Sequence, residues 1–147
     1  MKRLPDSGLV RFPDSWVDME SDHQSYLTLL STVGVPENLF GRYRVANAVS
    51  VRQAAGRQYA CFGQSGLDDS VCIDLTSGEV AELLGETGEM RFVNTSLELF
   101  NQAVNSVLAG FPFYERDASG EQLDRVAHEL GERLTAIDQP AMVPDRF

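Results

Sequence analysis

The chain has 147 residues and a formal net charge of −10, with 12 basic against 22 acidic residues. This length suits a single domain, 1–147, whose core is large enough to fold without a metal or a disulfide. The excess of negative charge disfavours binding to nucleic acid or to anionic membrane surfaces, because both are themselves negatively charged. It is compatible with a basic protein partner.

The N-terminus and the cysteine content favour a cytoplasmic protein without cofactors. No apolar run of about 7–15 residues follows Lys2 and Arg3, so we expect no signal peptide. No stretch approaches the roughly 18 apolar residues of a membrane span. Cys61 and Cys72 are the two cysteines, and they lack the four-ligand spacing of a zinc site. We expect them to be reduced, half-buried strand residues that bind no metal.

The chain begins with an irregular lead-in, 1–20, followed by a helix. A short strand is expected within the lead-in at Gly8–Phe12. A capping box starting at Ser21 predicts the helix N-terminus, and Gly34 is expected to end the helix in a left-handed conformation. The apolar positions of this segment follow helical spacing: Tyr26, Leu29, Leu30 and Val33.

From Tyr43 to Asn94 the apolar pattern changes to that of strands. Along 70–75, apolar and more polar residues alternate, which predicts one buried and one wet sheet face. Short connections such as Thr76–Gly78 favour antiparallel hairpins, because parallel strands need a long crossover. Five segments are predicted as strands, within an antiparallel sheet of about five to six: Arg44–Ser50, Gln58–Gly63, Ser70–Leu75, Glu79–Leu83 and Met90–Val93.

Two helices and a short tail, 138–147, complete the chain. Thr95 and Glu98 have the spacing of a capping box, as do Ser119 and Gln122. The order of helix, strands and two helices predicts an α+β fold with helices packed on a sheet. The last helix has an apolar stripe along one face: Leu123, Val126, Ala127, Leu130, Leu134 and Ile137.

Candidates for catalysis are few. Asp124, His128 and Glu132 are spaced four residues apart and share one face of the last helix. A histidine between two carboxylates can titrate near neutral pH or bind a metal, so a small hydrolase is one alternative. The same pattern is common on exposed helix faces with i,i+4 charge pairs, and we favour that interpretation.

Negative charge is concentrated in the second part of the chain. Residues 1–66 carry a net charge of +1, and residues 67–147 carry −11. Such a run can be a solvated sheet face with its loops, or a surface directed at a cationic partner. Residues 68–89 contain no Lys or Arg and seven carboxylates: Asp68, Asp69, Asp74, Glu79, Glu82, Glu86 and Glu89.

Three segments, in chain order, resemble the motifs of one family. Tyr26–Pro36 resembles an apolar first helix that ends in Gly-x-Pro. Val71–Val80 is similar to the hairpin motif apolar-x-Ile-Asp-x-x-x-Gly-x-Val, and Phe92–Phe100 to Val-Asn-x-Ser-Leu-x-x-Phe. Over about residues 20–137 the chain therefore resembles the fourth subgroup of the SUKH superfamily of bacterial immunity proteins, which have a Smi/Knr-like fold.

This resemblance implies a non-catalytic α+β domain that binds and neutralises a cognate bacterial toxin without a cofactor. Many such toxins are cationic, so it also implies a basic toxin domain as the partner. The motif residues in this chain have a structural character and supply no catalytic group: Gly34, Pro36, Asp74, Gly78, Asn94 and Ser96.

We therefore predict that the seven carboxylates between residues 68 and 89 form part of the contact surface. Opposite charge accelerates association, and carboxylates can occupy sites meant for substrate phosphates. Glu82 is ambiguous, because in a regular strand it shares a face with Val80. The alternative function is an intracellular adaptor or regulatory interaction module on the same fold.

Overall fold

The computed structural model describes residues 2–3, 8–13, 24–110 and 119–142. Within these ranges the chain forms two antiparallel sheets, three α-helices and one 3₁₀-helix. None of the described helices has the length and apolar character needed to cross a membrane. The smaller sheet has the order β1-β2-β3 and consists of short strands: β1 (Lys2–Arg3), β2 (Leu9–Arg11) and β3 (Val35–Pro36).

The larger sheet is a six-stranded antiparallel meander in the order β4-β5-β6-β7-β8-β9. The five predicted strands are confirmed, and β5 is longer than expected. The predicted α+β class is also confirmed, because helices pack on this sheet. Its strands are β4 (Asn38–Leu39), β5 (Tyr43–Ala54), β6 (Arg57–Gln64), β7 (Ser70–Asp74), β8 (Val80–Leu83) and β9 (Met90–Asn94).

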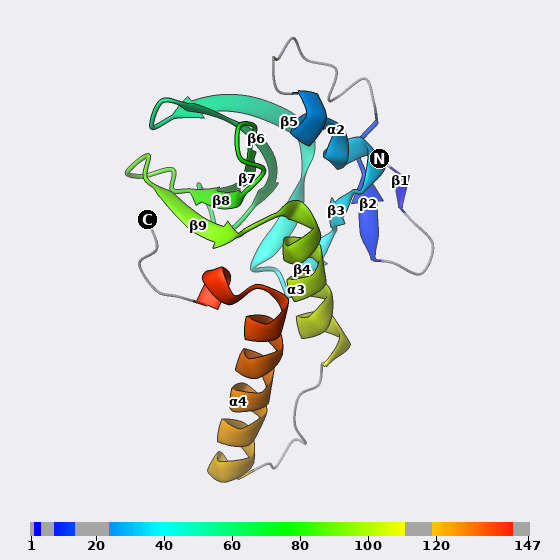
Figure 1. Cartoon of the computed structure of the whole chain (residues 1–147), viewed down its shortest axis with the longest axis vertical. Coiled ribbons are helices and arrows are strands. Elements are labelled where there is room, and N and C mark those ends of the chain that lie inside the picture. The colour runs from blue at the N-terminus through cyan, green and yellow to red at the C-terminus, as the bar shows by residue number, and fades with distance from the viewer. Residues whose placement is uncertain (1, 4–7, 14–23, 111–118, 143–147) are drawn as a thin grey trace.

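The larger sheet curls from β5 round to β9, as Figure 1 shows. The register shifts between Val45 and Ser50 on β5, at Phe62 on β6 and at Val93 on β9. At each shift one strand has more residues than its partner. Extra residues of this kind bend the strand and increase its twist, so the three irregularities account for the curl.

The main core lies between one face of this sheet and the helices α2 (Gln24–Thr32) and α3 (Leu97–Ala109). Three aromatic rings from distant parts of the chain meet edge to face, with centroids 5.6–6.5 Å apart. This geometry is the favoured one for aromatic pairs, so it helps to fix α3 against the sheet. The three rings belong to Tyr43, Phe62 and Phe100.

The opposite face of β6, β7 and β8 carries a second buried cluster. The prediction that this face of β7 is wet is wrong, because Cys72 and Asp74 are both buried. Cys61 and Cys72, expected to be half-buried, are both buried. Strands with both faces buried have little room for polar side chains, which explains the members of this cluster: Tyr59, Cys61, Cys72, Ala81 and Leu83.

The helix boundaries follow local signals. Gly34 has a φ of +89°, and a Cβ there would lie 2.7 Å from the carbonyl oxygen of Val10, so this position requires glycine. It lies two residues after the last residue of α2, and its amide donates to the Leu29 carbonyl at 3.0 Å, so Gly34 marks the end of the helix as predicted. The expected cap at Ser21 and most of the lead-in lie outside the described residues. The lead-in was expected to be irregular, but it contains the two short strands β1 and β2. Strand β2 confirms the strand expected at Gly8–Phe12.

The start of α3 differs from the prediction by one residue. The N-cap is Ser96, whose hydroxyl accepts a hydrogen bond from the Leu99 amide at 3.2 Å. The Thr95 hydroxyl instead donates to Asp138 at 2.7 Å. The N-cap therefore lies one residue after the predicted position, no capping box forms at the start of α3, and the Thr95 hydroxyl bonds a partner 43 residues away.

The last helix, α4 (Gly120–Ile137), extends away from the sheet in Figure 1. Its predicted capping box at Ser119 and Gln122 is confirmed. No residue of α4 is buried, so its apolar stripe is only partly covered. Within the predicted tail, the 3₁₀-helix η1 (Gln139–Met142) packs against β9 and returns the chain to the sheet.

Candidate functional site

The meander divides the seven predicted carboxylates between two ends of the sheet. In an antiparallel meander, alternate hairpin connections lie at the same end. The β6–β7 loop, residues 65–69, and the β8–β9 loop, residues 84–89, therefore share one end. The β5–β6 and β7–β8 turns share the other. The predicted set is thus two separate groups.

Two acidic loops are joined at the first end. The Gly85 amide of the β8–β9 loop donates to the Asp69 Oδ1 atom of the β6–β7 loop at 3.1 Å. A Cβ at residue 85 would collide with the backbone carbonyl of Asp68, so glycine permits this close approach. The Ser65 amide also donates to the Asp69 carbonyl oxygen at 3.1 Å, which closes the first loop. The two loops thus form one connected surface.

Exposed carboxylates and one exposed leucine occupy this surface. Asp68, Glu86 and Glu89 are exposed, and Asp69 is half-buried. Leu67, at the tip of the β6–β7 loop, is 99% exposed. No ion pair among the described side chains involves these four carboxylates. We call this surface the acidic edge and define it by five residues: Leu67, Asp68, Asp69, Glu86 and Glu89.

Glu82 lies beside the acidic edge and is already engaged. Its Oε2 atom accepts a hydrogen bond from the Ser65 hydroxyl at 2.5 Å, and the side chain is partly buried. Its direct cross-strand partner on β9 is Arg91. The bond from Ser65 ties Glu82 to the first residue of the β6–β7 loop, and opposite charges at directly paired strand positions are favourable.

Asp74, the last residue of β7, and Glu79, in the β7–β8 turn, lie at the other end of the sheet. The side chain of Asp74 is 4% exposed and forms an ion pair with Arg57 at 2.8 Å. The Asp74 Oδ1 atom also accepts from the backbone amides of Thr76 at 2.8 Å and Ser77 at 3.3 Å. Glu79 is half-buried, and its backbone carbonyl accepts from the Asp74 amide at 2.8 Å.

The surroundings of Asp74 favour its charged form. Burial by itself raises the pKa of this carboxyl. The hydrogen bond from Arg57 and those from the Thr76 and Ser77 amides outweigh it, so the pKa lies below its ordinary value. Asp74 therefore acts as a turn residue, and its oxygen atoms are occupied within the chain.

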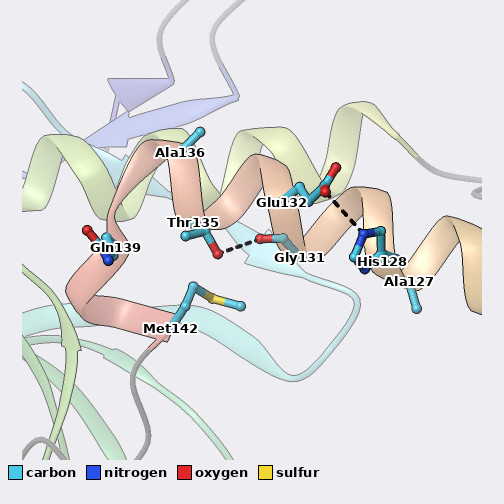
Figure 2. Close-up of a pocket in the computed structure, with 8 residues that line it drawn as sticks. All are labelled: Ala127, His128, Gly131, Glu132, Thr135, Ala136, Gln139 and Met142. Carbon is cyan, nitrogen blue, oxygen red and sulfur yellow. Dashed lines mark hydrogen bonds and ion pairs between the residues drawn. The ribbon is translucent and has the colours of Figure 1, made fainter.

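The helix face proposed for a hydrolase is open to solvent. His128 Nε2 lies 3.0 Å from Glu132 Oε1, and these side chains are 75% and 69% exposed. Figure 2 shows the pair on α4, at a shallow groove that continues towards Met142 of η1. Exposed i,i+4 pairs are ordinary on helices, and nothing in these contacts encloses the imidazole of His128. Among the described residues, no group of three or more His, Cys, Asp or Glu is arranged to hold a metal ion.

Two residues that the sequence analysis did not select have clear roles, one at the acidic edge and one in the fold. Leu67 is an apolar residue inside the polar loop sequence Ser65–Asp69, and that contrast is the signal that singles it out. Asp138 is buried and joins the last helix to the start of α3. No local signal marks Asp138, because its partners lie more than 40 residues away in the sequence.

The comparisons with known proteins identify a family. Its description is SUKH-4 immunity protein, and it matches residues 5–147, which includes most of the lead-in and all of the tail. Neither a curated protein nor a solved structure matches the chain. The match confirms the resemblance found in the three sequence motifs. An immunity protein is non-catalytic and implies a cognate toxin as its partner. The chain belongs to the SUKH-4 immunity protein family.

Proposed function

We propose that this immunity protein neutralises a cationic toxin domain by binding it through the acidic edge. The observation that carries the proposal is the 99% exposed Leu67 beside exposed carboxylates of two joined loops. The partner surface that fits is an apolar pocket surrounded by Lys or Arg side chains. A toxin that acts on a phosphate-containing substrate has such cations at its active site.

The carboxylates contribute mainly to the rate of association. A surface of one charge raises the encounter rate with an oppositely charged partner, and salt weakens this effect. The net charge of −11 in residues 67–147 adds to the same field. Leu67 contributes to the lifetime of the complex, because a buried apolar anchor mainly slows dissociation.

Order within the two loops supports a binding role. The hydrogen bonds at Gly85, Asp69 and Ser65 hold the loops in one arrangement before a partner arrives. A surface that is already ordered loses less conformational entropy on binding. Glu82 is assigned a supporting position in this proposal. Asp74 and Glu79, at the far end of the sheet, are not part of the proposed contact.

The cognate toxin domain is identified by its co-purification with this protein from the producing cells, and it is then produced as a catalytically disabled variant. The test measures the binding of that toxin domain to variants of this protein. The double variant Asp68→Lys, Glu86→Lys is compared with a control, Asp124→Lys, Glu129→Lys, on the exposed face of α4. Both variants change the net charge equally. The edge variant should lower the association rate constant at least about tenfold at low salt, and the control by less than about threefold.

The variant Leu67→Ser separates the apolar contribution from the charge. It should raise the dissociation rate constant about tenfold or more, with little effect on association. Surface plasmon resonance at several salt concentrations measures both constants. Equal losses in the edge and control variants would show that only net charge matters. Unchanged binding in the edge variant and in Leu67→Ser would place the contact elsewhere.

A further inference from the structure

The two cysteines of the chain face each other across neighbouring strands. Cys61 on β6 is in direct register with Cys72 on β7, and their sulfur atoms are 2.7 Å apart. The Leu75 amide donates to the Gln58 carbonyl at 3.0 Å, which makes Tyr59 and Asp74 a non-hydrogen-bonded pair. Cys61 and Cys72, two residues further along each strand, therefore also form a non-hydrogen-bonded pair.

This position suits a disulfide. In a non-hydrogen-bonded antiparallel pair the Cα atoms lie about 4.5 Å apart and the side chains are close. Disulfides occur at Cα separations of about 4.4–6.8 Å, so the backbone need not move far to join the two sulfur atoms. The cluster around them is apolar, with Tyr59, Ala81 and Leu83, and in the described part of the chain the two cysteines belong to no group of three or more metal-ligating side chains.

The two thiols have different chemical environments. The hydrogen bond between the two thiols and the nearby charge of Arg52 lower the pKa of Cys61 in spite of its burial. The same hydrogen bond and burial raise the pKa of Cys72. Cys61 retains 5% exposure, whereas Cys72 has none. Cys61 is thus the more accessible residue and the one that more readily becomes a thiolate, which is the reactive form.

We infer that hydrogen peroxide oxidises this pair to an intramolecular Cys61–Cys72 disulfide, with Cys61 as the attacking residue and Cys72 as the resolving residue. The Cys61 thiolate attacks a peroxide oxygen, the O–O bond breaks, and hydroxide leaves. The Cys61 sulfenic acid is then attacked by the Cys72 sulfur, whose proton leaves with the departing hydroxide as water. Two thiols lose two hydrogen atoms, and one peroxide becomes two waters.

The bond would link the strands on either side of the β6–β7 loop. The ring that it closes runs from residue 61 to residue 72 and contains residues 65–69. A disulfide restricts the open conformations of the segment that it closes. This inference does not depend on the toxin, and its test contains none.

The experiment treats the intact, folded protein with hydrogen peroxide, blocks remaining thiols and digests the protein without reduction. Trypsin leaves both cysteines in one peptide, 58–91, and cleavage before each Asp then separates residues 58–67 from 69–73. We expect these two fragments to remain joined until a reductant is added. Met90 falls in a different fragment, so methionine oxidation does not interfere.

Single variants test which sulfur reacts. In Cys72→Ala, Cys61 should accumulate a sulfenic acid that dimedone captures. In Cys61→Ala, the buried Cys72 should react at least about tenfold more slowly. Circular dichroism first establishes that each variant is folded. The digest of the wild-type protein tests the disulfide even if a variant fails to fold. Separate fragments after peroxide treatment, or a disulfide between two chains, would overturn the inference. Equal rates in the two variants would overturn the assignment of Cys61 as the attacking residue.

Discussion

Asp74 illustrates how one carboxylate of the acidic run 68–89 can belong to the fold although others, such as Asp68 and Glu86, lie at the surface. It accepts hydrogen bonds from Arg57 and from two amides of its own turn. These contacts hold the β7–β8 turn and connect it to the start of β6. A folded-state pKa below the ordinary value means that the charged form stabilises the folded protein.

We expect Asp74→Asn to lower the free energy of unfolding by about 1–2 kcal/mol at pH 7, because a charged hydrogen bond is lost. The contribution of Asp74 is fully present above its ordinary pKa of 3.8 and is lost as the pH falls through the lower folded-state value. The difference between variant and wild type should therefore shrink below about pH 4. Urea unfolding across this pH range measures it.

Asp68→Asn is the matched control for Asp74→Asn, since Asp68 is exposed and forms no ion pair among the described side chains. Its effect on unfolding should stay within about 0.5 kcal/mol. A larger effect for Asp68→Asn than for Asp74→Asn would contradict the structural role given to Asp74.

At the scale of elements, Asp138 connects the end of α4 to the junction of β9 and α3. Its carboxylate accepts from the Asn94 side-chain amide at 3.0 Å and from the Thr95 amide at 2.7 Å. Both Asp138 and Asn94 are buried. Since α4 itself buries no residue, the hydrogen bonds of Asp138 and the packing of η1 are important for fixing α4 to the rest of the protein.

We expect Asp138→Ala to lower the free energy of unfolding by about 2–4 kcal/mol, because buried donors lose their acceptor. Amide hydrogen exchange along α4 should accelerate more than in α3. Gln139→Ala, at an exposed neighbouring position, should change stability by less than about 0.5 kcal/mol. Unchanged exchange in α4 would mean that other contacts hold the helix.

The two joined loops of the acidic edge depend on Gly85. We expect Gly85→Ala to cost about 1–3 kcal/mol, because the added methyl group meets the Asp68 carbonyl and forces the loops apart. Toxin binding should weaken as well if the acidic edge is the contact. Thermal unfolding and surface plasmon resonance provide the two measurements.

Gly131→Ala supplies the contrast for Gly85→Ala. Nothing lies within 4 Å of a Cβ at this helical position. The substitution should stabilise the protein by up to about 1 kcal/mol, because alanine is the better helix former. If both substitutions have the same effect, the close approach of the two loops is not what makes Gly85 necessary.

At the scale of the whole molecule, the charge of −10 is a cost to the folded state. Added salt screens the repulsion between like charges, so the melting temperature should rise by a few degrees between about 20 and 500 mM NaCl. The edge variant Asp68→Lys, Glu86→Lys carries a net charge of −6, since each reversal adds two positive charges. The melting temperature of this variant should rise less with added salt than that of the wild type. An equal rise in the melting temperature of both proteins, measured by calorimetry, would mean that charge repulsion does not cause the salt dependence.

The sequence by itself determined the local features of this protein. Apolar spacing and turn residues located the five main strands, the helices and the Ser119 cap, because these depend on neighbours a few residues away. The order and shortness of the connections were enough to predict an antiparallel sheet. Three motifs were enough to indicate the family to which the chain belongs.

The tertiary structure decided which of these residues meet. The bulges set the curl of the sheet, and the alternation of hairpin ends separated Asp74 and Glu79 from the acidic edge. The contacts of Gly85 with Asp69 and of Thr95 with Asp138 join segments 16 and 43 residues apart. Such pairs leave no local pattern in the sequence, because the register of intervening strands determines whether they come together.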